Sequence, residues 1–155
     1  MRVLLQRTRW AAVKAADQSK VEIGPGIMGL VGFASEDEQL PGTRAWNVIV
    51  DKILHLRIFP DDRGLMNLSL VDVDGELLLV PQFTLYADCR RGRRPGFSGS
   101  APADAAGRLF DMFAEKVLKS WSRVSFGYFG AEMEVELCNW GPVTIMLDSS
   151  DYLQK

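Results

Sequence analysis

Two stretches of the chain repeat apolar residues at helical spacing. In residues 41–56, and again in residues 105–121, apolar side chains recur every three or four positions and so fall on one side of a helix. Pro41 and Gly42 mark the start of the first stretch, as expected at a helix boundary. The pattern therefore predicts two amphipathic helices, each with one face turned toward a core.

The other apolar residues fall in short runs that are typical of strands. The expected strands are residues 2–13, 27–33, 66–73, 77–80, 124–126, 133–138 and 143–147. Asp74-Gly75 is a hairpin turn signal, so the third and fourth of these runs are predicted to pair as an antiparallel hairpin. Because strands and helices do not alternate as they do in a parallel βαβ sheet, the pattern predicts the α+β class.

Length and composition favour one domain. A chain of 155 residues with 47% hydrophobic composition buries roughly two-thirds of its unfolded surface, which is enough for one core. We expect residues 1–148 to form this domain and residues 149–155 to form a frayed C-terminal tail. No run has the length and flanks of a signal peptide or membrane span, so a cytoplasmic protein without a membrane partner is expected.

Several kinds of catalytic site are excluded by the residue content. The single histidine, His55, and the two distant cysteines, Cys89 and Cys138, cannot assemble a zinc site, so no metal and no cofactor are expected. His55 lies within the first helical stretch and is assigned a structural or surface role, which disfavours a Ser-His-Asp mechanism. Cys138 ends an apolar run and is expected in the core, whereas Cys89 lies beside arginines that could make it reactive.

A basic loop precedes the second helix. The net charge of −2 gives no global attraction for nucleic acid, so any RNA contact has to come from a local patch. Residues 88–100, which we call the arginine loop, have no apolar period and contain Arg90, Arg91, Arg93 and Arg94. Four guanidinium groups flanked by Tyr86 and Phe97 suit contacts with an RNA backbone, but a solvated charged loop explains them equally well.

Two interrupted strands carry the other candidate chemistry. Pro81 ends an apolar run and is followed by Gln82-Phe83-Thr84, where exposed backbone amides could stabilise the oxyanion of ester hydrolysis. Asn139-Trp140-Gly141-Pro142 separates the last two expected strands, and its backbone could line a pocket, with the peptide before Pro142 either cis or trans. An ordinary strand end and a plain hairpin turn remain open as alternatives at these two places.

Specific motifs make the sequence resemble the D-aminoacyl-tRNA deacylase family over nearly its whole length. The matching runs are Pro81-Gln82-Phe83-Thr84-Leu85-Tyr86-Ala87-Asp88, Arg91-Gly92-Arg93-Arg94-Pro95, Phe129-Gly130-Ala131-Glu132-Met133 and Asn139 through Thr144. The resemblance implies a small β-barrel-like α+β domain that forms a homodimer and acts on aminoacyl-tRNA. It further implies hydrolysis of D-aminoacyl-tRNA, and of glycyl-tRNA mischarged on non-cognate tRNA.

The resemblance also implies roles for particular residues. Gly141-Pro142 of one subunit would enter the active site of the other and reject L-amino acids sterically. Backbone amides of Gln82, Phe83 and Thr84 would hold the oxyanion with help from the 2′-hydroxyl of the terminal adenosine, so Thr84 is assigned a positioning role rather than that of a nucleophile. Phe129 would line the amino-group side of the pocket, and Met133 would pack beneath Gly141-Pro142.

Two departures from the family pattern leave alternatives open. Pro81 stands where a serine is usual, which removes a hydroxyl and an N–H from the substrate-binding region. A sister group that removes L-alanine from mischarged tRNA also has proline there, but Phe83 and the Asn139 motif favour the ordinary group. Trp140 replaces a smaller polar residue and is expected to change the rim of the pocket. A noncatalytic tRNA-binding module that uses the arginine loop is the alternative from a different class.

Overall fold

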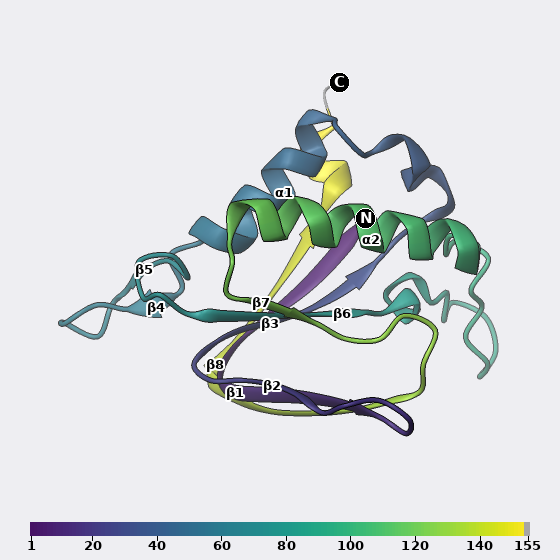
Figure 1. Cartoon of the computed structure of the whole chain (residues 1–155). Coiled ribbons are helices and arrows are strands. Elements are labelled where there is room, and N and C mark those ends of the chain that lie inside the picture. Colours follow the sequence, from purple (N-terminus) through teal and green to yellow (C-terminus); the bar gives the residue numbers. More distant parts are fainter. Residues whose placement is uncertain (154–155) are drawn as a thin grey trace.

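The computed structural model describes residues 1–153 of the chain (Figure 1). The helices are α1 (Arg44–His55) and α2 (Ala103–Ser120), with short 3₁₀ helices η1 (Ser35–Gln39), η2 (Phe83–Tyr86) and η3 (Ser149–Tyr152). The strands are β1 (Arg2–Ala15), β2 (Val21–Ile23), β3 (Gly26–Gly32), β4 (Phe59–Pro60), β5 (Met66–Leu68), β6 (Glu76–Pro81), β7 (Val124–Phe126) and β8 (Met133–Asp148). Within the described part, none of the helices is long and apolar enough to cross a lipid bilayer.

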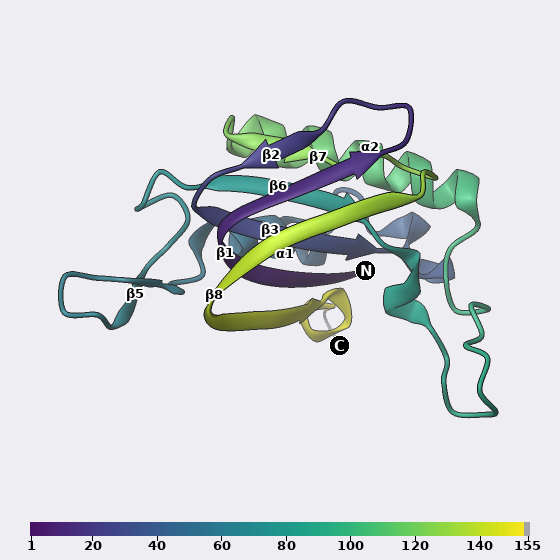
Figure 2. The same ribbon diagram turned by 90° about the horizontal axis from the view of Figure 1, so that it is seen from below.

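Six of the strands form one mixed, curved sheet, and both long helices cover the same face of it (Figures 1 and 2). The order is β2-β1-β3-β6-β7, with β8 also paired to β1. β1 is antiparallel to its three partners, whereas β6 is parallel to both β3 and β7. Two helices against a curved, barrel-like sheet confirm the predicted α+β class.

The apolar faces of both helices pack into the main core. The buried side chains of α1 are Ala45, Trp46, Ile49, Val50, Ile53 and Leu54, and those of α2 are Ala105, Ala106, Leu109, Phe110, Phe113 and Val117. Trp46 of α1 and Phe113 of α2 meet edge to face, with ring centroids 5.2 Å apart. The Thr43 hydroxyl accepts a hydrogen bond from the Trp46 N–H and so caps the start of α1. Both predicted helices are therefore confirmed.

The predicted hairpin around Asp74-Gly75 is wrong. β5 pairs with the short β4, and β6 pairs in parallel with β3 and β7 instead of with β5. Residues 70–75 form a compact turn in which the Gly75 N–H donates to the Leu70 carbonyl. Leu77 and Leu79 face the main core, while Leu78 and Val80 face a second apolar cluster, so β6 is buried on both sides. A strand of this kind is typical of parallel pairing with partners that are distant in sequence.

Three further predictions, all about the C-terminal part of the chain, differ from the structure. The runs 133–138 and 143–147 belong to one long strand, β8, whose pairing with β1 shifts register between Gln6 and Trp10. Cys138 of β8 is exposed rather than in the core, because it lies on the outward face of a strand that has one open side. The predicted frayed tail is a 3₁₀ helix over Ser149–Tyr152 that contacts α1, with the Ser149 N–H bonded to the Met1 carbonyl. Residues 154 and 155 of that tail lie outside the described residues.

Candidate active site

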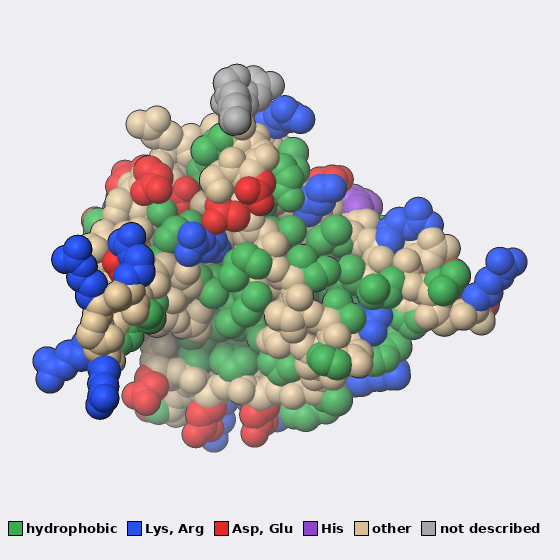
Figure 3. Space-filling view, turned by 180° about the vertical axis from the view of Figure 1, so that it is seen from behind, with side chains coloured by type: hydrophobic (Ala, Val, Ile, Leu, Met, Phe, Trp, Pro, Cys, Tyr) green, Lys and Arg blue, Asp and Glu red, His purple; other side chains and the backbone are tan. Residues whose placement is uncertain are grey.

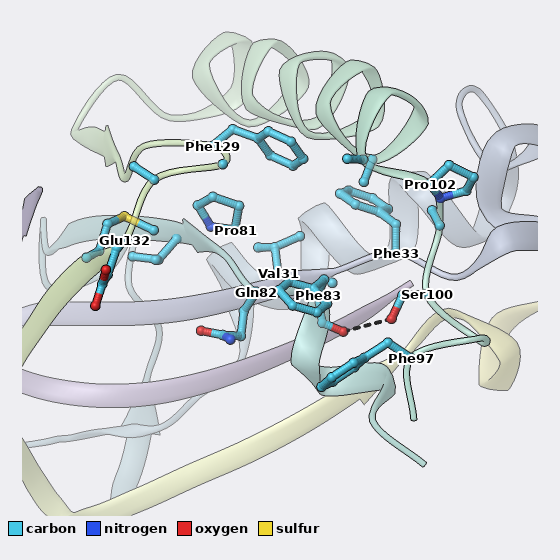
Figure 4. Close-up of a pocket in the computed structure, with 18 of the residues that line it drawn as sticks. Val31, Phe33, Pro81, Gln82, Phe83, Phe97, Ser100, Pro102, Phe129 and Glu132 are labelled. Atoms are coloured by element: carbon cyan, nitrogen blue, oxygen red, sulfur yellow. Dashed lines mark hydrogen bonds between the residues drawn. The ribbon is translucent and has the colours of Figure 1, made fainter. Parts of the chain in front are cut away.

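A cleft of about 840 Å³ opens where β6 ends. Its walls come from the ends of β3 and β6 and the start of η2, from the loop before α2 and the first turn of α2, and from residues 129–135, which lead into the start of β8. Figure 4 shows the rings of Phe83, Phe97 and Phe129 around it. The cavity is large enough for a small organic group such as a nucleoside ester, and its walls are mostly apolar.

Five of the predicted site residues line this cleft. They are Pro81, Gln82, Phe83, Phe129 and Met133. Gly107 of α2 leaves space for Phe129, since a Cβ at this position would lie 3.3 Å from the Phe129 ring. Met133 packs against the preceding turn, where the Tyr128 nitrogen lies 3.3 Å from the Met133 sulfur. The structure therefore brings together two segments that lie almost 50 residues apart in the sequence.

The backbone N–H groups at the start of η2 differ in whether they already have a hydrogen-bond acceptor. The Gln82 N–H donates to the Val31 carbonyl at 2.7 Å, which continues the pairing of β6 with β3. No acceptor is found among the described residues for the N–H groups of Phe83 and Thr84, because the first amides of a helix have no partner within it. Of the three predicted oxyanion donors, two are thus free to bind a ligand.

Side-chain contacts hold this turn in place. The Gln82 side-chain amide donates to the Thr84 hydroxyl at 2.5 Å. The Ser100 hydroxyl donates to the Phe83 carbonyl at 3.1 Å, across the end of the cleft (Figure 4). The Phe83 and Phe97 rings pack at a steep angle with centroids 5.0 Å apart. These contacts fix the direction of the Phe83 and Thr84 N–H groups, although Thr84 itself does not line the cleft.

The Gly141-Pro142 peptide is cis, and it lies on the surface away from the cleft of its own chain. Asn139 supports the turn, because its Oδ1 accepts from the Val143 N–H at 2.8 Å and its Nδ2 donates to the Thr144 hydroxyl at 3.0 Å. Gly141 has φ +138°, a conformation that favours glycine. The structure therefore does not join Asn139, Gly141 and Pro142 to the other predicted site residues within one chain.

Arg7 supports the same turn and was missed by the sequence patterns. It is 6% exposed, and its guanidinium donates to the Trp140 carbonyl at 2.8 Å and to the Ile58 carbonyl. The Trp140 ring lies under the guanidinium groups of Arg7 and Arg9, whose Cζ atoms are 4.6 and 3.6 Å from its centroid. Burial, followed by the charge of Arg9, lowers the pKa of Arg7. The available signal was an arginine at an inward position of β1, in phase with buried Val3 and Leu5.

The arginine loop projects from the molecule, and Lys and Arg side chains gather at that end in Figure 3. Two backbone hydrogen bonds between Asp88 and Gly96 close its base. Arg90 is bound to Asp88 through two contacts of 2.8 and 2.7 Å, and this hydrogen-bonded guanidinium holds the pKa of the Asp88 carboxyl well below its ordinary value. No ion pair is found within residues 1–153 for Arg91, Arg93 or Arg94. Three of the four arginines therefore have guanidinium groups free for a ligand.

The other titratable candidates do not form a second site. His55 is exposed at the end of α1, beside Asp51, in agreement with the structural or surface role expected for it. Cys89 is exposed in the arginine loop. Within the described residues, no three His, Cys, Asp or Glu side chains are grouped to hold a metal ion.

Comparison with known proteins identifies the family. The family model described as D-Tyr-tRNA(Tyr) deacylase matches residues 4–148. A D-aminoacyl-tRNA deacylase of Nitratidesulfovibrio vulgaris strain DP4 is 48% identical over 153 residues, covering 97% of this chain and 94% of the relative. Many further curated proteins match as well.

Solved structures share the fold. The structure titled c-Myc DNA Unwinding Element Binding Protein superimposes with a TM-score of 0.86 at 35% identity, covering 96% of this chain and 98% of that chain. A probable eukaryotic D-amino acid tRNA deacylase, at 24% identity, has the same fold with a TM-score of 0.79 and coverage of 94% and 97%. On these matches over nearly its whole length, the chain belongs to the D-Tyr-tRNA(Tyr) deacylase family.

Proposed function

We propose that this protein hydrolyses the ester bond of D-aminoacyl-tRNA, and of glycyl-tRNA mischarged on non-cognate tRNA, releasing free amino acid and tRNA. The observation that carries the proposal is the pair of unpartnered N–H groups of Phe83 and Thr84 beside the cleft. Two fixed backbone donors suit the negative charge that develops on an ester oxygen in the transition state. The names of the curated relatives agree with this substrate.

In the proposed reaction, this chain supplies binding and oxyanion stabilisation rather than a nucleophile. Water adds to the ester carbonyl carbon, the bond to the ribose oxygen breaks, and a proton passes to that oxygen through the neighbouring hydroxyl of the terminal adenosine. The Thr84 hydroxyl accepts a hydrogen bond from Gln82, and no base contacts it among the described residues. Thr84 is therefore a positioning residue, since a nucleophilic hydroxyl needs a base to take its proton.

We also propose a homodimer in which Gly141-Pro142 of each subunit enters the cleft of the other. Its support is that this turn is exposed outside its own cleft while Arg7 and Asn139 hold it firmly. β8, which carries the turn, also exposes large apolar side chains at Val135 and Met146. A rigid turn above the bound amino acid would exclude the L-enantiomer by steric overlap, while hydrogen or a D side chain would point away.

The decisive test is a deacylation assay with purified protein. We expect D-Tyr-tRNA to be hydrolysed under conditions in which L-Tyr-tRNA stays intact. If D-Tyr-tRNA survives, the proposal is wrong. Pro81 leaves open the alternative of a deacylase that removes L-alanine from mischarged tRNA. Esters of L-Ala, Gly and D-Ala in the same assay test it, because turnover of L-alanyl-tRNA would favour that alternative.

The arginine loop is proposed to bind the phosphate backbone of tRNA. We expect replacement of Arg91, Arg93 and Arg94 by alanine to weaken tRNA binding and to lower the slope of log affinity against log salt by about one for each phosphate that the protein no longer binds. Titration by fluorescence anisotropy at several salt concentrations measures both. Arg63→Ala, which removes an exposed arginine from the turn between β4 and β5, is the control and should leave the slope unchanged. A slope that stays constant in the triple variant contradicts this role.

A noncatalytic nucleic-acid-binding module is the second candidate, and the arginine loop and the name of one structural relative favour it. This candidate predicts salt-dependent binding of uncharged tRNA without turnover of any aminoacyl ester. The deacylation assay separates the two functions. A cytoplasmic location, where aminoacyl-tRNA is made and used, is part of the proposal.

A further inference from the structure

Two arginines of β1 lie beside the same aromatic ring, and no carboxylate balances their charges. The Cζ atoms of Arg7 and Arg9 are 4.6 and 3.6 Å from the centroid of the Trp140 ring. Within residues 1–153, neither arginine forms an ion pair. The pKa of Arg7 is lowered by burial and, next, by the charge of Arg9, so the two cations repel each other. An anion from outside the chain would therefore bind favourably at this place.

Only Arg9 has donors left for such an anion. The Arg7 guanidinium is buried and donates to the carbonyls of Trp140 and Ile58. Arg9 is exposed, and its guanidinium donates no hydrogen bond to any of the described residues. Stacking on the Trp140 ring occupies a face of the planar group and leaves the N–H groups at its edge free. A guanidinium edge matches two oxygens of a phosphate group.

The structure holds Arg9 in place before any ligand binds. The Trp140 ring packs edge to face against Phe59, with centroids 6.2 Å apart, and the Trp140 carbonyl accepts from Arg7 at 2.8 Å. A guanidinium that rests on a fixed ring loses less side-chain freedom on binding than one that extends into solvent. Arg9 and Trp140 therefore form a preorganised cationic site.

This site lies beside the Gly141-Pro142 turn, because Trp140 directly precedes Gly141. The turn is proposed to enter the cleft of the other subunit, so it would bring Arg9 to the rim of that cleft. The cleft itself offers no cation, since no lysine or arginine lines it in the described part of the chain. In an aminoacyl-tRNA, the phosphate on the 5′ side of the terminal adenosine is the phosphate closest to the ester. A cation at the rim would meet this phosphate when the ester lies inside.

We infer that Arg9 of one subunit binds the phosphate on the 5′ side of the terminal adenosine, while the aminoacyl ester of the same tRNA lies in the cleft of the other subunit. The inference rests on the proposed deacylation and on the proposed homodimer, and it names one contact by which the substrate is held. Arg9 binds the substrate and takes no part in bond breaking. Trp140 is the surface on which Arg9 rests.

A tRNA that lacks this single charge tests the contact. The wild type and Arg9→Gln are assayed on D-Tyr-tRNA and on D-Tyr-tRNA with an uncharged methylphosphonate in place of that phosphate. We expect either change alone to lower kcat/KM about tenfold, the effect of one charge-assisted hydrogen bond. Both changes together should cost less than about twofold more, because they remove the same contact. Arg63→Gln, an exposed arginine of the turn between β4 and β5, is the control and should leave kcat/KM unchanged on both tRNAs.

The possible results separate the inference from the proposed function. If the two losses multiply, Arg9 acts through the turn or the subunit contact and not through this phosphate, and the inference is overturned. Full activity of Arg9→Gln on the unmodified tRNA overturns it as well. Both results leave the proposed function standing, because the wild type is active in them. A wild type that leaves unmodified D-Tyr-tRNA intact overturns the proposed function, and the inference with it.

Mixed dimers test whether Arg9 serves the other subunit. One subunit carries Arg9→Gln, and the other carries Phe83→Pro. Proline suits the first residue of a helix and removes one of the two free N–H groups, which should lower the activity of that cleft by about 100-fold or more. The working cleft then belongs to the Arg9→Gln subunit and receives Arg9 from its neighbour.

We expect such a mixed dimer to keep about half of the wild-type activity on unmodified D-Tyr-tRNA, because one of the two symmetric clefts works. Activity about tenfold below that value would place Arg9 at the cleft of its own chain and would overturn the inference. A protein that is monomeric in solution, as measured by light scattering at the assay concentration, would overturn it too.

Discussion

Gly141→Ala is expected to lower kcat/KM for D-aminoacyl-tRNA by about 100-fold or more, because small displacements of a group that positions the substrate have effects of this size. A Cβ at residue 141 would lie 2.9 Å from Arg7 Nη2, 2.9 Å from Val143 Cγ2 and 3.1 Å from the Val143 nitrogen. The φ of +138° adds backbone strain for any L-residue. The Gly141-Pro142 turn must therefore move, and with it the surface proposed to enter the partner's cleft.

Single-turnover deacylation of D-Tyr-tRNA measures this effect, and tRNA binding measured in parallel shows whether the variant still recognises its ligand. Gly64→Ala is a matched control. Gly64 also has a positive φ, of +78°, but a Cβ there would meet nothing within 4 Å, and the residue lies far from the cleft in the turn between β4 and β5. Normal activity of Gly141→Ala would contradict the proposed role of the turn, and loss of activity in Gly64→Ala would point to a general effect of backbone strain.

Gly26→Ala is expected to have the largest effect on stability. A Cβ at this position would lie 1.8 Å from the carbonyl oxygen of Glu76 and 2.7 Å from its backbone carbon and nitrogen. The obstacle is the backbone of β6, which cannot move without separating the parallel pair of β3 and β6. We expect the free energy of unfolding to fall by more than about 4 kcal/mol, in the range that strand separation and core disruption produce.

Urea denaturation followed by circular dichroism measures the loss. Gly24→Ala, two residues earlier, is the control, because a Cβ there would meet only the Glu76 side-chain oxygen, at 3.4 Å. That distance is an ordinary contact with a flexible group, so a change below about 1 kcal/mol is expected. Equal stability of the two variants would show that the close approach of β3 to β6 does not require glycine at residue 26.

The same strand pair connects stability to function. β6 ends at Pro81, and the Gln82 N–H bonds to the Val31 carbonyl next to the end of β3. This contact sets the point at which the chain leaves the sheet and turns into η2. The Phe83 and Thr84 amides are consequently placed by the pairing of β3 with β6, so damage to that pairing should also reduce activity.

Local signals in the sequence were enough to locate the two helices and the family motifs. Apolar residues at helical spacing located α1 and α2 correctly, because the period of a helix is set within a few residues. The motif around Gln82 and the motif around Gly141 were both recognised from consecutive residues, and the family they indicated is shown by the comparisons. The expectation that His55 lies in the first helix, with a structural or surface role, also agrees with its exposed place in α1.

Strand pairing and the meeting of the site residues, in contrast, depend on long-range contacts that local patterns did not predict. Asp74-Gly75 resembles a hairpin turn, yet β6 lies between β3 and β7. The side chains of β6 are apolar on both faces, and a strand of this kind is stable in the interior of a sheet that is covered on both faces. Folding also joined residues 129–135 to the end of β6, gave the Gln82 N–H a partner in β3, and left Gly141-Pro142 outside the cleft of its own chain. These outcomes depend on contacts between residues tens to more than a hundred positions apart, for which hydrophobic period and turn residues carry no signal.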